Sequence, residues 1–232
     1  MAPHPLVTPG TAGEQIGRLL VAVMIIMMLP SLPFGGYIVY PFTILTTWFH
    51  EMGHGMTALL MWQEFVQLEI YPSGSGVAMS RIDADISPLA SAAIAAGGPL
   101  APCLVGSALI VASAHPRMWR PVLWGMAAAI FLSVIIYVRS PVGYYVLPLV
   151  GAGIALLAWR APDRLTQFTL QFLGVMGALS MLRDFDYLFS ESAVINGQVM
   201  LSDTGQIEEA LWLPHWVWAA IILAICAVMV GA

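Results

Sequence analysis

The chain carries little charge and no lysine. Its 232 residues include 8 basic residues, all of them arginine, and 13 acidic residues, so only 9% are charged and the formal net charge is −5. A typical soluble domain carries about 25% charged residues. A nucleic-acid interface needs a concentrated basic surface. We therefore expect neither an ordinary soluble domain nor a nucleic-acid-binding protein.

Cysteine is also scarce. The two cysteines, Cys103 and Cys226, each lie within an apolar run, which does not indicate a disulfide framework. Intrinsic disorder is excluded by the opposite property, because 59% of the residues are hydrophobic and the mean hydropathy is +0.85. These values predict an all-α polytopic membrane protein with almost no soluble part.

Uncharged stretches locate the membrane segments, because a span needs about 20 mostly apolar residues. The run 19–49 is too long for one span and is interrupted at 30–36, where two prolines and two glycines indicate a turn. It predicts one helix at 18–30 and a second at 38–61. The other candidate spans are 86–116, 121–138, 140–159, 165–182 and 210–232. We expect six or seven transmembrane helices in a single integral-membrane domain, residues 1–232, that begins with a flexible N-terminus at 1–17.

One segment between spans has the polarity pattern of β-strands. Residues 65–71 and 77–81 alternate between polar and apolar, and the sequence Pro-Ser-Gly-Ser-Gly at 72–76 is typical of a turn. We predict one short membrane-associated β-hairpin at 65–81, with a plain amphipathic loop at the membrane interface as the alternative.

The second span contains the sequence His50-Glu51-Met52-Gly53-His54. Positions i and i+4 of a helix lie about 40° apart around the axis, so both imidazoles can bind one zinc ion from the same face. Glu51 is offset enough to reach a water on the metal rather than the metal itself. Ionisable residues within a span are costly and rare without a function. We expect His50 and His54 to bind one catalytic zinc and Glu51 to act as general base, with a buried polar network as the alternative.

A catalytic zinc usually takes three protein ligands and leaves one position for water. Asp184 is the preferred third ligand, because the long apolar stretch 165–182 carries it toward the membrane interior. Asp203, just before the last span, is the second choice and Asp186 the third. Each of these residues has a simpler interpretation as an interfacial anchor or a helix cap.

In this order along the chain, the motifs resemble those of the site-2 proteases, a family of intramembrane zinc metallopeptidases. Phe49–His54 matches the family's F-H-E-x-G-H, the hairpin at 68–77 follows, and residues 95–101 are similar to its A-G-P-L-A segment. The stretch 172–184, followed by Ser202-Asp203-Thr204, looks like a compact B-like branch in which an S-D-A motif precedes the final helix. The resemblance covers about residues 38–218.

The resemblance implies regulated intramembrane proteolysis, in which peptide bonds within or near the transmembrane segments of membrane-anchored proteins are hydrolysed. The classical family pattern draws its third ligand from an N-x-x-P-x-x-x-L-D-G stretch. This chain has no such stretch, and its single asparagine is Asn196. The third ligand therefore stays open among Asp184, Asp203 and Asp186.

Substrate-binding candidates come from the hairpin and from the glycine-rich part of the third span. An unwound substrate segment can add to the free edge of a hairpin as an extra strand. Glycines let helices approach closely and can make room for a substrate. The candidates are Gly74, Gly76, Val77, Gly97, Gly98 and Pro99.

Two other classes of function fit the same motif. One is a zinc hydrolase of a small or lipidic substrate, and the other is a non-proteolytic zinc-binding membrane protein, either a transporter or an inactive relative. A transporter is expected to carry ionisable residues on several spans, whereas here they gather around one helix pair. An inactive relative is expected to have lost Glu51, which is present.

The expected setting is a lipid bilayer, and the compactness of the chain favours a bacterial inner membrane. Orientation does not follow from the positive-inside rule, because an N-terminus on the inside puts three loop arginines inside and four outside. Oligomeric state is left open.

Overall fold

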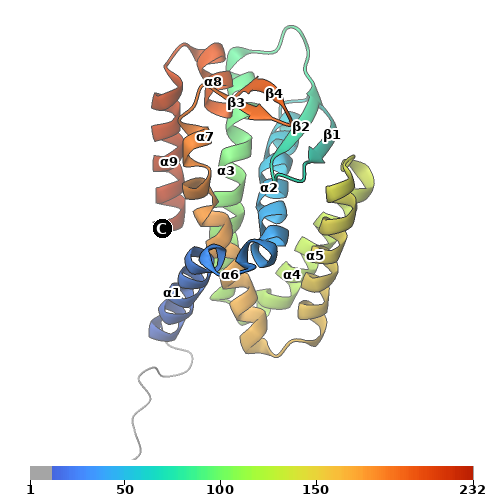
Figure 1. Ribbon diagram of the computed structural model, residues 1–232, viewed down its shortest axis with the longest axis vertical. Helices are drawn as coiled ribbons and strands as arrows, with labels where there is room; N and C mark the ends of the chain where they lie inside the picture. The colour runs from blue at the N-terminus through green and yellow to red at the C-terminus, as the bar shows by residue number, and fades with distance from the viewer. Residues whose placement is uncertain (1–11, 232) are drawn as a thin grey trace, which may run out of the picture.

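The computed structural model describes residues 12–231 and is mostly helical, with two small antiparallel sheets (Figure 1). The helices are α1 (Ala12–Met28), α2 (Gly35–Leu60), α3 (Pro88–Ser113), α4 (Trp119–Ile136), α5 (Pro141–Arg160), α6 (Asp163–Arg183), α7 (Phe185–Leu188), α8 (Asp203–Leu211) and α9 (His215–Gly231). The strands are β1 (Glu64–Ile70), β2 (Gly76–Arg81), β3 (Ser192–Ile195) and β4 (Gln198–Leu201). Each predicted helix overlaps one of these helices, and the predicted hairpin corresponds to β1 and β2.

Helices long and apolar enough to cross a membrane are fewer than the sequence predicted. Within the described residues, four meet both criteria: α3, α4 with the short turn before it, α5 and α6. Helices α8 and α9 add a fifth if the two, bent by 115° at their junction, count as one broken span. The protein is therefore a multi-pass membrane protein with four or five candidate spans. The predicted total of six or seven spans is not shown.

Two predicted spans are missing from this set for different reasons. Helix α2 has 26 residues but is not among the candidates, because two histidines, a glutamate, threonines and glycines dilute its apolar character. At the N-terminus, the apolar helical stretch Ile16–Ser31 is shorter than a full span. The flexible segment expected at 1–17 lies mostly outside the described residues, and residues 12–17 belong to α1.

Helix α3 is the centre of the bundle and packs against α2, α6, α8 and α9 (Figure 1). Glycines at its contacts let the backbones approach closely, which is how membrane helices commonly associate. A Cβ atom added to Gly106 of α3 would lie 2.6 Å from the backbone of both Gly174 and Ala178 on α6. On the other side of α3, Gly97 packs against Gly53 and Thr57 of α2. These contacts fix α2, which carries the histidines, relative to α3 and α6.

Both hairpins lie at one end of the bundle, with β3–β4 beside α8 and β1–β2 against α2 (Figure 1). The outer edge of β1 is occupied, because Leu68 donates its N–H to Tyr137 and accepts a hydrogen bond from the N–H of Arg139. Ala78 on β2 lies directly opposite Leu68. Opposed residues of an antiparallel pair either bond to each other or both face outward, so the backbone groups of Ala78 point away from β1. Within the described residues, no strand pairs with the free edge of β2.

The second hairpin, β3–β4, was not predicted. Its strands are joined by the two residues Asn196 and Gly197, both with positive φ angles, 49° and 80°. This is the conformation of a type I′ turn, which an Asn-Gly pair favours. The hairpin connects α7 to α8 and so brings the end of α6 near the start of the last helices.

The glycine contact between α3 and α6 generates a stability prediction. We expect Gly106→Ala to destabilise the protein by about 1–3 kcal/mol, because the added methyl group meets the α6 backbone rather than a side chain that can move. Thermal unfolding in detergent measures the effect. The matched control is Gly125→Ala on α4, where an added Cβ would meet no atom within 4 Å. Equal unfolding temperatures for the two variants would show that this contact does not determine the packing.

Candidate metal centre

Helix α2 places its polar and its small residues on different sides. His50, Glu51 and His54 face a cavity, and the rings of the two histidines lie edge to face with centroids 4.9 Å apart. Gly53 faces α3, and Gly55 lies against the ring of Phe65 on β1. The His-Glu-x-x-His spacing thus directs three polar side chains into one cavity. The glycines between and after them let α2 pack closely against α3 and β1.

Asp203 completes a group of three potential metal ligands. Its carboxylate oxygens lie 3.0 Å from Nε2 of His50 and 3.2 Å from Nε2 of His54, and the two Nε2 atoms are 3.2 Å apart. One ligand atom from each residue falls within 4.8 Å of the others. Two imidazole nitrogens and a carboxylate oxygen are a donor set typical of a zinc or other transition-metal site.

The burial of the Asp203 carboxylate, and the lack of a hydrogen-bond donor for one of its oxygens among the described residues, also favour a metal ion at this site. Asp203 is 2% exposed, and its Oδ2 has no hydrogen-bond donor among the described residues, although Nε2 of His50 lies 3.0 Å away. A buried charge is costly unless it is paired or coordinates a metal. Glu51, 5% exposed, is a second buried carboxylate on the same cavity. A divalent cation would balance this concentration of negative charge.

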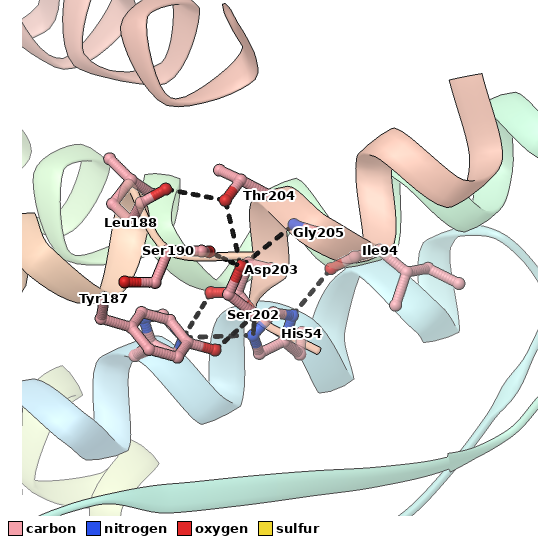
Figure 2. A network of polar contacts seen from close by, with 10 residues as sticks. His54, Ile94, Tyr187, Leu188, Ser190, Ser202, Asp203, Thr204 and Gly205 are labelled. Carbon is pink, nitrogen blue, oxygen red and sulfur yellow. Dashed lines mark hydrogen bonds and ion pairs between the residues drawn. The ribbon is translucent and has the colours of Figure 1, made fainter. Parts of the chain in front are cut away.

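A backbone contact from α3 orients His54. Its Nδ1 lies 2.8 Å from the carbonyl oxygen of Ile94, which accepts a hydrogen bond when Nδ1 carries the proton (Figure 2). Nε2 then presents a lone pair, as metal-binding histidines do when their other nitrogen is hydrogen-bonded. Gly98 lies against the same ring, and any side chain there would overlap it. Helix α3 therefore contributes orientation through its backbone.

Asp203 is held in place by the residues on either side of it. Ser202 is the N-cap of α8 and accepts a hydrogen bond from the N–H of Gly205, so Asp203 begins the helix, where the dipole favours a carboxylate. The hydroxyl groups of Ser202 and Thr204 donate to the carbonyl oxygens of Ser190 and Leu188 (Figure 2). These bonds fasten the start of α8 to the end of α7 and close the base of the β3–β4 hairpin.

The site opens into a cavity of about 240 Å³. The helices α2, α7 and α8 supply its polar groups, and β2 forms one wall. Hydrophobic side chains of the β3–β4 hairpin form another wall. The lining residues are His50, Glu51, His54, Gly76, Val77, Ala78, Ser80, Ile82, Ile94, Tyr187, Ile195, Met200, Leu201, Asp203 and Gln206.

The aspartate that lies at the two histidines is Asp203, the second choice from the sequence, and not Asp184. Asp184 follows the last residue of α6, is partly exposed, and forms an ion pair with Arg183 at 3.3 Å. Asp186 is exposed on α7. Neither belongs to the group formed by His50, His54 and Asp203.

The predicted substrate-binding residues divide into three sets: two line the cavity, one fixes the hairpin turn, and three lie on α3. Gly76 and Val77 line the cavity, and a Cβ on Gly76 would lie 2.8 Å from the carboxylate of Glu51. Gly74 has a φ angle of 90°, and its carbonyl oxygen accepts a 2.6 Å hydrogen bond from Thr47, which fixes the hairpin turn on α2. The other three, Gly97, Gly98 and Pro99, are not among the residues that line the cavity, and the two glycines pack α3 against α2.

The sequence analysis missed the cavity residues that follow α6. Tyr187 lies on α7, and Ile195 and Met200 share one face of the β3–β4 hairpin. The signal for the hairpin was present, since Asn196-Gly197 between two apolar tetrads is a strong hairpin pattern. No sequence signal marked Tyr187, because its relevance depends on contacts with a residue 16 positions later.

Comparison with known proteins agrees with the arrangement of the site. No curated protein and no solved structure matches the chain. One family model does match, that of the Peptidase M50B-like family, over residues 18–232. The matched range includes His50, Glu51, His54 and Asp203. The chain therefore belongs to the M50B-like peptidases, which are site-2 protease-like intramembrane metallopeptidases.

Proposed function

We propose that the protein is an intramembrane zinc metalloendopeptidase that cuts membrane-anchored proteins within or near their transmembrane segments. The observation that carries this proposal is the convergence of His50, His54 and Asp203 beside Glu51 in one cavity. Family membership and the multi-pass helical fold support it. The expected compartment is a bacterial inner membrane.

The residues present fit a zinc ion. His50 and His54 would bind it through Nε2 and Asp203 through its carboxylate, a three-ligand set that leaves a position for substrate or water. When bound, zinc supplies a Lewis acid that polarises a carbonyl group and makes water more acidic. Two features favour this role: the buried Oδ2 of Asp203 has no hydrogen-bond donor among the described residues, and the contact of His54 Nδ1 with the Ile94 carbonyl leaves Nε2 directed at Asp203.

Glu51 would move the proton. The backbone of Ala78 hydrogen-bonds to its carboxylate, and burial restricts the side chain to a position facing the cavity. In peptide hydrolysis it accepts a proton from the attacking water and delivers it to the nitrogen of the leaving amine. Because β2 and α2 both contact Glu51, the general base and the proposed substrate edge are held together.

The free edge of β2 would hold the substrate. A transmembrane helix hides its amides in internal hydrogen bonds, so it must unwind before a peptide bond can be attacked. Gly76 and Ala78 line the cavity on the β1–β2 hairpin. Their partners on β1, Ile70 and Leu68, direct backbone hydrogen bonds to residues outside the hairpin, so the backbone groups of Gly76 and Ala78 also point away from β1. An extended substrate segment can therefore add to β2 without displacing an existing strand, pairing with Gly76 and with the carbonyl of Ala78, whose N–H is bonded to Glu51.

Zinc content tests the ligand set. We expect about one zinc per chain in the detergent-purified wild type, measured by elemental mass spectrometry, and loss of zinc in His54→Ala and Asp203→Ala. Asp184→Ala is the matched control, since it removes an aspartate from the α6 end without touching the histidines. Zinc retained by Asp203→Ala and lost from Asp184→Ala would contradict the proposed ligand set.

Glu51→Gln tests the hydrolytic role separately from metal binding. The amide is nearly isosteric but cannot accept the proton, so we expect hydrolysis to fall by at least about 100-fold with zinc content unchanged. Cleavage of membrane-anchored reporter proteins in proteoliposomes measures the rate. If Glu51→Gln cleaves as the wild type does, the general base lies elsewhere. If the zinc-loaded wild type cleaves no protein, the peptidase proposal fails.

Backbone methylation of a cleavable peptide tests the strand-addition step. Successive amides of an added strand point alternately toward and away from β2. We therefore expect N-methylation at alternate positions to slow cleavage and methylation at the intervening positions to have little effect. The unmethylated peptide is the control, and a pattern without period two would argue against strand addition.

A further inference from the structure

Hydrolysis of a peptide bond requires a hydrogen-bond donor for the carbonyl oxygen, which becomes negatively charged as water attacks. Such preorganised donors are often worth about 100-fold to 1000-fold in rate. Asp203 as a metal ligand and Glu51 as the proton acceptor offer oxygen atoms that accept hydrogen bonds, so neither serves as this donor. Among the described residues that line the cavity, neutral side-chain donors are carried by Ser80, Tyr187 and Gln206. The position of each decides which can act at the metal centre.

Tyr187 is the neutral donor in direct contact with the metal-ligand group. Its hydroxyl donates to Oδ1 of Asp203 at 3.3 Å, and its ring lies edge to face with that of His50, with centroids 6.4 Å apart (Figure 2). Gln206 is an exposed residue farther along α8. Ser80 lies beyond Ala78 on β2, toward the end of the hairpin. Of these three donors, the tyrosine hydroxyl is therefore the one that hydrogen-bonds to a metal-ligand residue.

The position of Tyr187 is fixed by the same bonds that fix Asp203. The carbonyl oxygen of the next residue, Leu188, accepts a 2.7 Å hydrogen bond from Thr204, and Ser202 bonds to Ser190. The hydroxyl itself is held less firmly, since 3.3 Å is long for an O–H···O hydrogen bond. It can turn from Asp203 to another acceptor without movement of α7.

We propose that Tyr187 is a catalytic residue that donates a hydrogen bond to the carbonyl oxygen of the scissile peptide; this inference rests on the peptidase function proposed above. Water oxygen bonds to the carbonyl carbon, one water proton passes to Glu51, and the carbonyl π electrons move to the oxygen that faces Tyr187. When the C–N bond breaks, a lone pair on this oxygen re-forms the C=O bond. The bonding pair leaves with the nitrogen, which takes the proton from Glu51. Tyr187 keeps its own proton throughout.

Tyr187→Phe removes the hydroxyl and keeps the ring against His50. With fluorescein-labelled casein in detergent as an unfolded probe substrate, we expect kcat to fall by about 100-fold and KM to stay within twofold. Zinc per chain stays at the wild-type level. The matched control is Tyr145→Phe on α5, since Tyr145 is exposed and is not among the residues that line the cavity. Wild-type kcat in Tyr187→Phe would overturn the inference.

A binding measurement gives a second readout that does not depend on turnover. A phosphinic peptide carries a tetrahedral, anionic centre in place of the scissile bond, and calorimetry on the zinc-loaded protein measures its Kd. We expect Tyr187→Phe to raise this Kd by about tenfold or more, since hydrogen bonds to charged groups are the stronger ones. An unchanged Kd, or a loss of zinc that accounts for the loss of rate, would overturn the catalytic role.

The outcomes separate this inference from the proposed function. A zinc-loaded wild type that neither cleaves casein nor binds the phosphinic peptide contradicts the peptidase function, and the role of Tyr187 fails with it. A wild type that does both, beside a Tyr187→Phe variant that does both equally well, contradicts the role of Tyr187 alone.

Discussion

The constraint on which the structure depends is that two buried carboxylates and two partly buried histidines must be held together in a membrane protein. His50, Glu51, His54 and Asp203 lie around one cavity, and neither carboxylate is more than 5% exposed. In such surroundings a charge is tolerated only with a partner or a metal. The rest of the fold can be understood as the means of bringing these groups to one place and preventing them from separating.

Close backbone approach is how the fold meets this constraint. Around the site, glycines occupy the points where a side chain would overlap a functional group: Gly98 at the ring of His54 and Gly76 at the carboxylate of Glu51. Backbone atoms then orient these groups, the Ile94 carbonyl for His54 and the Ala78 backbone for Glu51. Backbone groups held in a helix or a strand have fewer ways to move than side chains do, so the site is preorganised.

The parts of this site that follow from local sequence could be predicted, and those that depend on distant contacts could not. The spacing of His50 and His54 fixes their common face on any helix, and the hairpin at 65–81 follows from its alternation and turn. Asp203 lies 149 positions after His54, and no periodicity relates them. Asp184 looked better placed because an apolar helix precedes it, yet the neighbouring Arg183 holds it in a partly exposed ion pair. Four or five candidate spans are shown where the sequence predicted six or seven, because α2 is 26 residues long but its two histidines, its glutamate and its threonines lower its mean hydropathy.

The segment that follows α6 acts as a unit opposite α2 and β2. It contributes Tyr187, then the β3–β4 hairpin, then Asp203, and the bonds from Ser202 and Thr204 close it into a loop of fixed shape. One face of its hairpin presents Ile195 and Met200 to the cavity, while the opposite wall presents the backbone edge of β2. A segment extended along β2 would therefore place its backbone at Glu51 and alternate side chains against an apolar surface. This arrangement suits a peptide drawn from an apolar membrane helix, since the energy lost by unwinding it is offset by strand pairing on one side and apolar burial on the other.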